Sequence, residues 1–311
     1  MNTEYQHKAV LLQEAVDALA VKPEGLYVDG TFGRGGHSQL ILKQVDNQCQ
    51  LIAFDKDIQA IEHAEQILGA NDSFSVAHRS FAEMEEEIKQ RGLDGQVDGV
   101  LLDLGVSSPQ LDEAERGFSF MHDGPLDMRM DQSQGWSAAE WLARASVDEI
   151  RRVIKEYGEE RFATRIARAI VEIREETPIT TTAQLAKIID EAVPKKDPGK
   201  HPATRSFQAI RIHINKELSD LEAGLDAAMN ILKPGGRMVV ISFHSLEDRI
   251  VKRFFKKLAK GDDFPRDFPI TADAIKPKMK LLGKPQKPAD DEVDENIRSR
   301  SAIMRVAEKL W

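Results

Sequence analysis

Three aspartates, Asp29, Asp55 and Asp103, each follow directly on a short apolar run that is typical of a buried β-strand. Between the first two lies a segment with four glycines in seven residues, Gly30 to Gly36. Glycines let the backbone turn tightly and approach a ligand without an intervening Cβ. Because the carboxyl ends of parallel strands meet at one edge of a sheet, these residues predict a nucleotide-like binding site there.

The glycine segment departs from the dinucleotide-binding pattern G-x-G-x-x-G, since counting from Gly33 places Ser38 at the last position. Asp55 is placed to accept hydrogen bonds from the two ribose hydroxyls of an adenosine ligand. Its alternative role is to cap a helix that begins near Asp57. Asp29 would repel a pyrophosphate but suits the sulfonium of S-adenosylmethionine. The sequence therefore favours S-adenosylmethionine over a nicotinamide dinucleotide.

The segment from Asp103 to Gln110 leaves the third of these strands through a glycine and a proline. It resembles the Asp/Asn-Pro-Pro-aromatic loop of amino-group methyltransferases. An exocyclic base amine is a poor nucleophile, so a site must hold acceptors against its N–H bonds and align nitrogen with the methyl carbon. Asp103 could supply one acceptor, and the carbonyls around Ser107, Ser108 and Pro109 the others. A helix cap and a turn are the alternative roles of Asp103 and Pro109.

The elements that must position these residues alternate along the chain. Apolar runs predict strands at 26–29, 51–54, 74–77, 97–102, 237–243 and 301–307, and helical patterns cover 11–19, 38–45, 58–68 and 205–232. The segment from Gly261 to Asn296 is rich in Pro, Lys and Asp and is expected to be mostly loop. This order predicts an α/β fold with a mostly parallel sheet.

No convincing strand follows Pro109 until Met238, and helix-capping boxes begin at Ser137, Ser146 and Thr181. We therefore predict an inserted all-helical domain at 110–205, within a core formed by 1–109 and 206–311. The core of this insertion is expected to hold its larger apolar and aromatic side chains, which are Trp136, Trp141, Ile154, Tyr157, Phe162, Ile166 and Ile170.

Composition limits the partners and the chemistry. The single cysteine, Cys49, excludes an intramolecular disulfide and a cysteine-based zinc cluster, and no other metal-ligand spacing occurs, so no metal is expected. The absence of a bilayer-length apolar run and the polar start of the chain predict a cytoplasmic protein with no membrane partner. With a net charge of -9, a polyanion would have to meet a local basic segment. Arg249 to Lys260 and Lys195 to Arg205 are candidates, although ordinary solvated surfaces explain them equally well.

Six longer motifs complete the pattern: DGTFGRGGHS (29–38), LLDLGVSSPQLD (101–112), ERGFSF with DGPLDMRM (115–130), YGEERFATRIARAI (157–170), HPATRSFQAIRI (201–212) and ISFHSLEDRIVKRF (241–254). Together they resemble the RsmH (formerly MraW) family of bacterial 16S rRNA cytosine-N(4) methyltransferases. The resemblance spans nearly the whole chain. It implies a Rossmann-like, S-adenosylmethionine-dependent methyltransferase core, with the inserted helical domain in substrate recognition. The implied target is a cytidine of the decoding centre.

Carried over position by position, the resemblance also implies the site residues. Together with the glycine pattern, it gives as cofactor contacts Gly33, Gly35, Gly36, His37, Asp55, Phe81, Asp103 and Gln110. The implied partner is 16S rRNA within the small ribosomal subunit, and a homodimer is left open. Gln110 stands where amino-group methyltransferases carry the aromatic residue that stacks on a flipped base. The remaining candidates for stacking are Phe118, Phe120, Phe243 and His244.

Three rival functions stay open at this point. A DNA or protein amino-methyltransferase would share the loop that follows Asp103. An RNA-binding or assembly protein would keep the fold without the chemistry, although the intact glycines, Asp55 and Asp103 argue against it. A dehydrogenase is least supported, because its dinucleotide pattern is incomplete.

Overall fold

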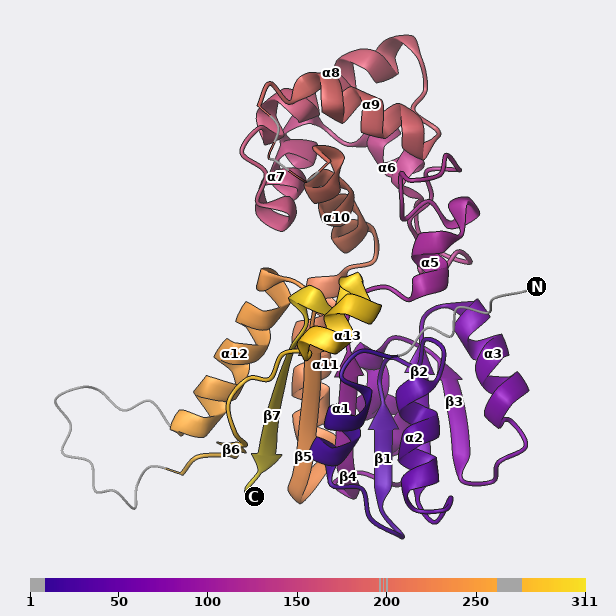
Figure 1. The fold of residues 1–311 in the computed structure, drawn as a ribbon, viewed down its shortest axis with the longest axis vertical. Coiled ribbons are helices and arrows are strands. Elements are labelled where there is room, and N and C mark those ends of the chain that lie inside the picture. Colours follow the sequence, from indigo (N-terminus) through magenta and orange to yellow (C-terminus); the bar gives the residue numbers. More distant parts are fainter. Residues whose placement is uncertain (1–8, 196, 198, 200, 262–275) are drawn as a thin grey trace, which may run out of the picture. The chain divides into compact units, whose positions relative to one another are not determined.

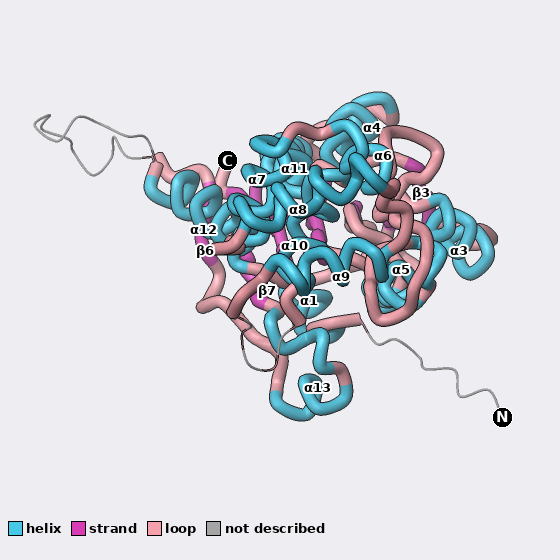
Figure 2. Tube along the Cα trace, turned by 90° about the horizontal axis from the view of Figure 1, so that it is seen from above, coloured by secondary structure: helices cyan, strands magenta, loops and turns pink. Residues whose placement is uncertain are grey.

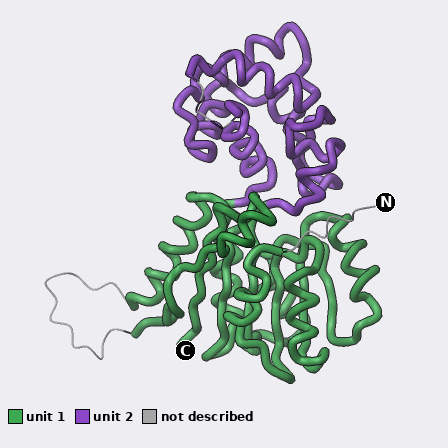
Figure 3. Tube along the Cα trace, viewed as in Figure 1, with its two compact units in different colours: residues 1–105, 218–311 green, residues 106–217 purple. Residues whose placement is uncertain are grey.

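The computed structural model describes residues 9–195, 197, 199, 201–261 and 276–311. The chain forms two compact units (Figure 3). Unit 1 combines Met1–Gly105 with Leu218–Trp311, and unit 2 is Val106–Glu217. Within the described residues, no helix has both the length and the apolar character to span a membrane.

A mostly parallel sheet of seven strands forms the centre of unit 1, in the order β3-β2-β1-β4-β5-β7-β6 (Figure 1). The strands are β1 (Leu26–Asp29), β2 (Gln50–Asp55), β3 (Phe74–His78), β4 (Val97–Asp103), β5 (Leu232–Ser242), β6 (Met279–Leu281) and β7 (Ile303–Lys309). Among these seven strands of the described residues, β7 pairs antiparallel with β5 and β6, and the other pairings are parallel. The strand order reverses between β1 and β4, which is where open α/β sheets bind their ligands. The predicted α/β class is confirmed.

Helices cover both faces of this sheet. Successive side chains of a strand point to opposite faces, and the side chains of the central strands are buried on both. Leu101 and Val239 point into one core with α1 and α2. Leu102 and Val240 point into the opposite core with α4, α11 and α12. The helices of unit 1 named here are α1 (Leu12–Leu19), α2 (Gly36–Gln44), α3 (Ile58–Leu68), α4 (Met84–Gln90), α11 (Glu217–Ile231), α12 (Ser245–Lys260) and α13 (Asp290–Glu295).

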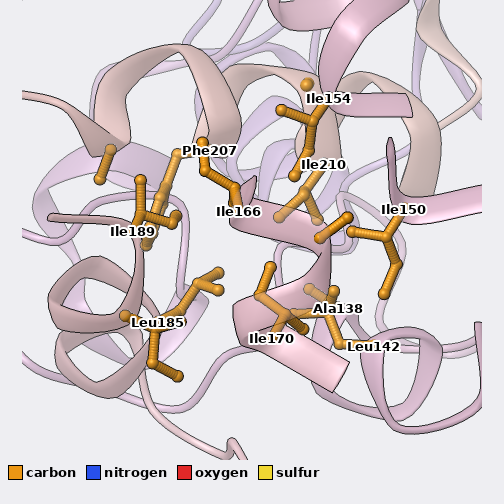
Figure 4. Close-up of a cluster of buried hydrophobic side chains, with 14 of the residues drawn as sticks. Ala138, Leu142, Ile150, Ile154, Ile166, Ile170, Leu185, Ile189, Phe207 and Ile210 are labelled. Atoms are coloured by element: carbon orange, nitrogen blue, oxygen red, sulfur yellow. The ribbon is translucent and has the colours of Figure 1, made fainter. Parts of the chain in front are cut away.

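Every labelled element of unit 2 is a helix (Figure 2). These elements are α5 (Ser108–Asp112), α6 (Ala138–Arg144), α7 (Val147–Gly158), α8 (Ala163–Glu176), α9 (Thr182–Ala192) and α10 (Ala203–Ile214). Leu185, Ile189 and Phe207 belong to its separate core (Figure 4). Ser137 and Thr181 form the predicted capping boxes, and Ser146 caps α7.

One expected core residue of unit 2 lies outside the core. Trp136 is 53% exposed. The guanidinium of Arg144 lies over its ring, 4.8 Å from the centroid. A flanking cation therefore covers this indole, and its placement among the core aromatics was wrong.

Three further differences from the expected elements have local causes. Unit 2 extends beyond 110–205 because α10 packs on α7 and shares the core of unit 2. The helix expected over 205–232 is divided into α10 and α11 by Lys216, whose φ of 54° cannot continue an α-helix. The expected loop from Gly261 to Asn296 contains β6 and α13; its residues 262–275 lie outside the described part.

Candidate cofactor and catalytic site

The glycine loop after β1 is fastened to the strands on both sides of it. The backbone N–H of Gly33 donates to Asp55 Oδ2 at 2.8 Å, at the end of β2. On the other side, the N–H of Asp103 donates to Thr31 Oγ1 at 2.7 Å, at the end of β4. The predicted convergence of the loop with Asp55 and Asp103 is therefore present, at the point where the strand order reverses.

Two glycines in this loop have left-handed backbone conformations, with φ of 54° at Gly33 and 76° at Gly35. A Cβ at Gly35 would lie 2.6 Å from Phe32 Cζ, so a side chain would clash there. A Cβ at Gly33 would meet no protein atom within 4 Å. The backbone at Gly33 thus borders open space, as close approach of a ligand requires.

Asp29, at the end of β1, is hydrogen-bonded both to the glycine loop and to α2. Its carboxylate is 1% exposed and accepts from Ser38 Oγ at 2.6 Å and from the Thr31 N–H at 3.1 Å. Burial raises the pKa of Asp29, and these two hydrogen bonds oppose the rise. Asp29 therefore links the loop to the start of α2 and places a buried carboxyl group next to the loop.

Asp55 receives two backbone hydrogen bonds, from Gly33 as described and from the N–H of Asp57 at 2.9 Å. The N-cap of α3 is Asp57, which accepts from the N–H of Gln59 at 3.0 Å. Asp57, and not Asp55, therefore caps this helix. Burial raises the pKa of Asp55 to about 6, and the nearby Asp57 and Asp29 add to this rise.

Asp103 and His37 lie together at the same edge, with 3.6 Å between His37 Nδ1 and Asp103 Oδ2. Burial lowers the pKa of His37 to about 4, so this ring is neutral at physiological pH. Burial, followed by the charges of Asp29, Glu247 and Glu292, raises the pKa of Asp103 well above its usual value. Asp103 Oδ1 and His37 Nε2 are buried and have no hydrogen-bond partner among the described residues. Both atoms are therefore available to a ligand that binds at this edge.

Phe81 begins a single 3-10 turn after β3 and is held by α11. A Cβ at Gly224 would lie 2.4 Å from its Cδ2, so the ring packs directly on that helix. Ser80 Oγ donates to Asp220 Oδ2 at 2.7 Å, and Lys56 forms an ion pair with the same carboxylate. Sequence reasoning missed Gly224, Asp220 and Lys56, because no local pattern links residues so far apart in the chain.

Ser108, Pro109 and Gln110 form the first turn of α5 and belong to unit 2. Ser107 is the N-cap of this helix, so the cap alternative does not apply to Asp103. Gln110 is buried, and its Oε1 accepts from the Ser107 N–H at 2.9 Å. Pro109 suits the first turn because a missing N–H costs nothing there.

The four candidates for base stacking divide between the units. In unit 2, Phe118 is 5% exposed, and the ring of Phe120 packs on that of Phe207 with 4.8 Å between centroids. In unit 1, Phe243 is half-buried at the end of β5, and His244 caps α12. Phe243 and His244 directly follow β5 at the carboxyl edge of the sheet of unit 1.

Comparisons with known proteins give one consistent family. The model of the MraW methylase family matches residues 4–310. The ribosomal RNA small subunit methyltransferase H of Alteromonas mediterranea is 60% identical over 313 residues, which cover 99% of this chain and 98% of the relative. Both matches extend across the two units.

Two solved structures also align with the chain. An rRNA methylase from Streptococcus thermophilus gives a TM-score of 0.44 at 10% identity, over 96% of this chain and 95% of its own. A SAM-dependent O-methyltransferase from Thermotoga maritima gives a TM-score of 0.42 at 11% identity, over 98% of this chain and 67% of its own.

Proposed function

The chain belongs to the MraW methylase family, and from that premise we propose that it transfers the methyl group of S-adenosylmethionine to N4 of a cytidine in 16S rRNA. The 60% identical relative is named as a methyltransferase of the small-subunit RNA. The observation that carries the proposal is the meeting of the glycine loop with Asp55 and Asp103 where the strand order reverses.

The residues at this edge fit S-adenosylmethionine. The open space at Gly33 admits a ligand against the backbone. The unpartnered Asp103 Oδ1 and His37 Nε2 offer an acceptor and a ring nitrogen to its polar groups. One buried carboxyl group, Asp29, and two partly buried ones, Asp55 and Asp103, lie around the loop and favour a cation over a pyrophosphate. When bound, S-adenosylmethionine supplies an electrophilic methyl group on a sulfonium.

We assign the parts of the cofactor to separate residues. Asp55 receives the ribose hydroxyls through lone pairs that the Gly33 and Asp57 N–H groups do not use. Phe81 packs against the adenine. Gly35, Gly36 and His37 surround the methionine portion at the start of α2.

Asp103 is assigned to the acceptor amine. Its carboxylate accepts a hydrogen bond from an N4–H, which orients the nitrogen lone pair toward the methyl carbon. The amine loses a proton when it is methylated, and the raised pKa of Asp103 suits this residue to take that proton.

The first prediction tests this assignment. Asp103→Asn keeps the shape of the side chain but removes its charge, so turnover should fall by about 10²-fold or more. Thermal unfolding should stay close to that of the wild type. The readout is the N4-methylcytidine content of 16S rRNA, measured by nucleoside mass spectrometry after incubation with purified protein.

Near wild-type turnover of Asp103→Asn would refute the catalytic role. An unchanged methylcytidine level with the wild-type protein would instead favour a DNA or protein substrate. Failure of the wild-type protein to bind S-adenosylmethionine in calorimetry would favour an RNA-binding or assembly protein.

We further propose that the substrate is the small ribosomal subunit in the cytoplasm. Methylation with labelled cofactor of naked 16S rRNA and of small subunits lacking the modification distinguishes the two substrate states. Light scattering of the purified enzyme tests whether it is a homodimer. Subunits that accept no label while naked RNA does would overturn the proposal.

A further inference from the structure

Helix α12 carries a continuous basic face. Six cations recur at the spacing i, i+3, i+4, i+7, i+8 and i+11, which places them along one side of a helix. All six are exposed, and no acidic residue lies among them. We call this set the α12 ridge: Arg249, Lys252, Arg253, Lys256, Lys257 and Lys260.

The rest of α12 is fixed to unit 1. Val251 and Phe255, on the opposite side, are 0% and 2% exposed in the core beneath the sheet. Asp248 receives two hydrogen bonds from the guanidinium of Arg305, at 2.7 and 3.0 Å. Because the apolar face is already buried, the helix has none left to insert into a bilayer. The α12 ridge therefore exposes its positive charges to solvent on a helix that is held in place by the core of unit 1.

Four of these cations, Lys252, Arg253, Lys256 and Lys257, form no ion pair within the part of the chain that the structure describes. The exposed cation of α4 behaves differently, since Lys89 lies 2.5 Å from Glu85 in an i,i+4 pair. The chain as a whole carries a net charge of -9. Unneutralised positive charge is therefore concentrated on this helix face, against the overall balance of the protein.

The helix also begins at the proposed active site. Ile241 of β5 pairs with Asp103 of β4, and the chain passes from the end of β5 through His244 directly into α12. Arg249 lies about one turn along the helix, and the ridge continues for about 17 Å at a rise of about 1.5 Å per residue. Nucleic-acid strands rise about 3.4 Å per nucleotide, so this length can face several consecutive phosphates.

We propose that the α12 ridge binds the sugar–phosphate backbone of rRNA next to the target cytidine. The inference rests on the proposed function, since it takes the occupant of the neighbouring site to be a nucleotide of the same RNA. Phosphates match the ridge in charge and in linear repetition. The ridge contributes affinity and no chemistry, because none of its residues belongs to the cofactor or acceptor site.

The test removes charge without shortening the side chains. A variant with Lys252, Arg253, Lys256 and Lys257 each replaced by Gln is compared with the wild type in methylation of small subunits between 50 and 200 mM salt. The KM for subunits should rise at least tenfold at low salt, with kcat unchanged. The slope of log(1/KM) against log salt should become shallower by about 3 to 3.5, because each of the four phosphate contacts contributes about 0.7 to 0.9.

A matched control changes the same net charge elsewhere in unit 1. Lys43, Lys89, Lys280 and Lys284 are exposed, lie outside the ridge, and are replaced together by Gln. This variant should keep the wild-type KM and salt slope. Calorimetric titration with S-adenosylmethionine should give the same affinity for all three proteins and so show that unit 1 is folded.

The outcomes separate the two proposals. If the ridge variant and the control have the same KM and salt slope, RNA does not bind the ridge. If the ridge variant retains RNA affinity but loses binding of an acidic protein, the occupant is that protein and the inference is overturned. If the wild-type protein methylates no rRNA at all, the proposed function itself fails.

Discussion

Asp55 should make cofactor binding dependent on pH. Its pKa of about 6 in the folded protein lies above the ordinary value of 3.8. Ribose hydroxyls donate best to the ionised carboxylate, so S-adenosylmethionine should bind about tenfold more weakly at pH 5 than at pH 7. Isothermal titration calorimetry across this range measures the change. Proton release on binding near pH 6 should accompany it.

The sign of this effect follows from the direction of the shift. A carboxyl whose pKa is raised by folding stabilises the cofactor-free protein at low pH, and that contribution is lost as pH rises through 6. His37, with a pKa of about 4, is neutral throughout and contributes nothing between pH 5 and 7. Asp55→Asn should bind weakly with a shallower pH dependence. An affinity that stays constant from pH 7 to pH 5 would contradict the assignment.

Gly35 and Gly33 should respond differently to alanine. Gly35→Ala combines a positive φ with a Cβ 2.6 Å from the Phe32 ring, and should lower the free energy of unfolding by about 2 kcal/mol or more. The new Cβ in Gly33→Ala meets no protein atom, so this variant should lose only about 1 kcal/mol of stability through backbone strain. The same Cβ would occupy space that we assign to S-adenosylmethionine, so cofactor affinity should fall. Thermal unfolding and cofactor titration separate the two effects.

Gly92→Ala is the control for backbone strain alone. Its φ is 69°, and a Cβ there meets nothing within 4 Å. It should resemble Gly33→Ala in stability and the wild type in affinity for S-adenosylmethionine. Equal cofactor affinity of the Gly33 and Gly92 variants would show that the ligand does not approach Gly33.

At the scale of elements, α11 should tune the cofactor site through Asp220. Asp220→Ala removes the acceptor of the Ser80 hydroxyl and the ion-pair partner of the partly buried Lys56. Unit 1 should lose about 1–3 kcal/mol of stability. The KM for S-adenosylmethionine should also rise several-fold, because the turn that begins at Phe81 loses its support.

Two comparisons make this prediction specific. Asp220→Asn keeps an acceptor for Ser80 and should fall between the wild type and the alanine variant. Lys89→Ala breaks the exposed pair with Glu85, and should leave both the stability of unit 1 and the KM close to those of the wild type. A normal KM in Asp220→Ala would separate α11 from cofactor binding.

The same elements show what sequence reasoning can and cannot supply. The edge that carries Asp55 and Asp103 was predictable, because apolar runs followed by polar residues locate strand ends and parallel strands align them. Asp220 was not, since its partner Ser80 is 140 positions away and α11 carries no local mark of the contact. The break at Lys216 was missed because a lysine rarely adopts positive φ, and β6 because three residues are too few to reveal a period of two.

At the scale of the molecule, the two units have separate hydrophobic cores, and mutations should act on one unit at a time. Ile189 is fully buried in unit 2. Ile189→Ala should destabilise that unit by about 2–5 kcal/mol while affinity for S-adenosylmethionine is unchanged. Because we assign substrate recognition to this unit, rRNA methylation should fall.

Differential scanning calorimetry with and without S-adenosylmethionine measures this independence. The cofactor should raise the unfolding temperature of unit 1 alone, and Ile189→Ala should lower that of unit 2 alone. Leu102→Ala, in the core of unit 1, should give the reverse pattern. One transition that shifts as a whole in every case would contradict separate cores.

The position of unit 2 within the chain also sets an order in time. Strand β4 ends before unit 2, whereas its neighbour β5 begins only after unit 2 is complete. At about 5–20 residues per second, synthesis of the intervening chain takes roughly ten seconds. Throughout that interval β4 presents an open edge of the kind that promotes aggregation. The nascent chain therefore has the most to gain from chaperone protection while unit 2 is being made.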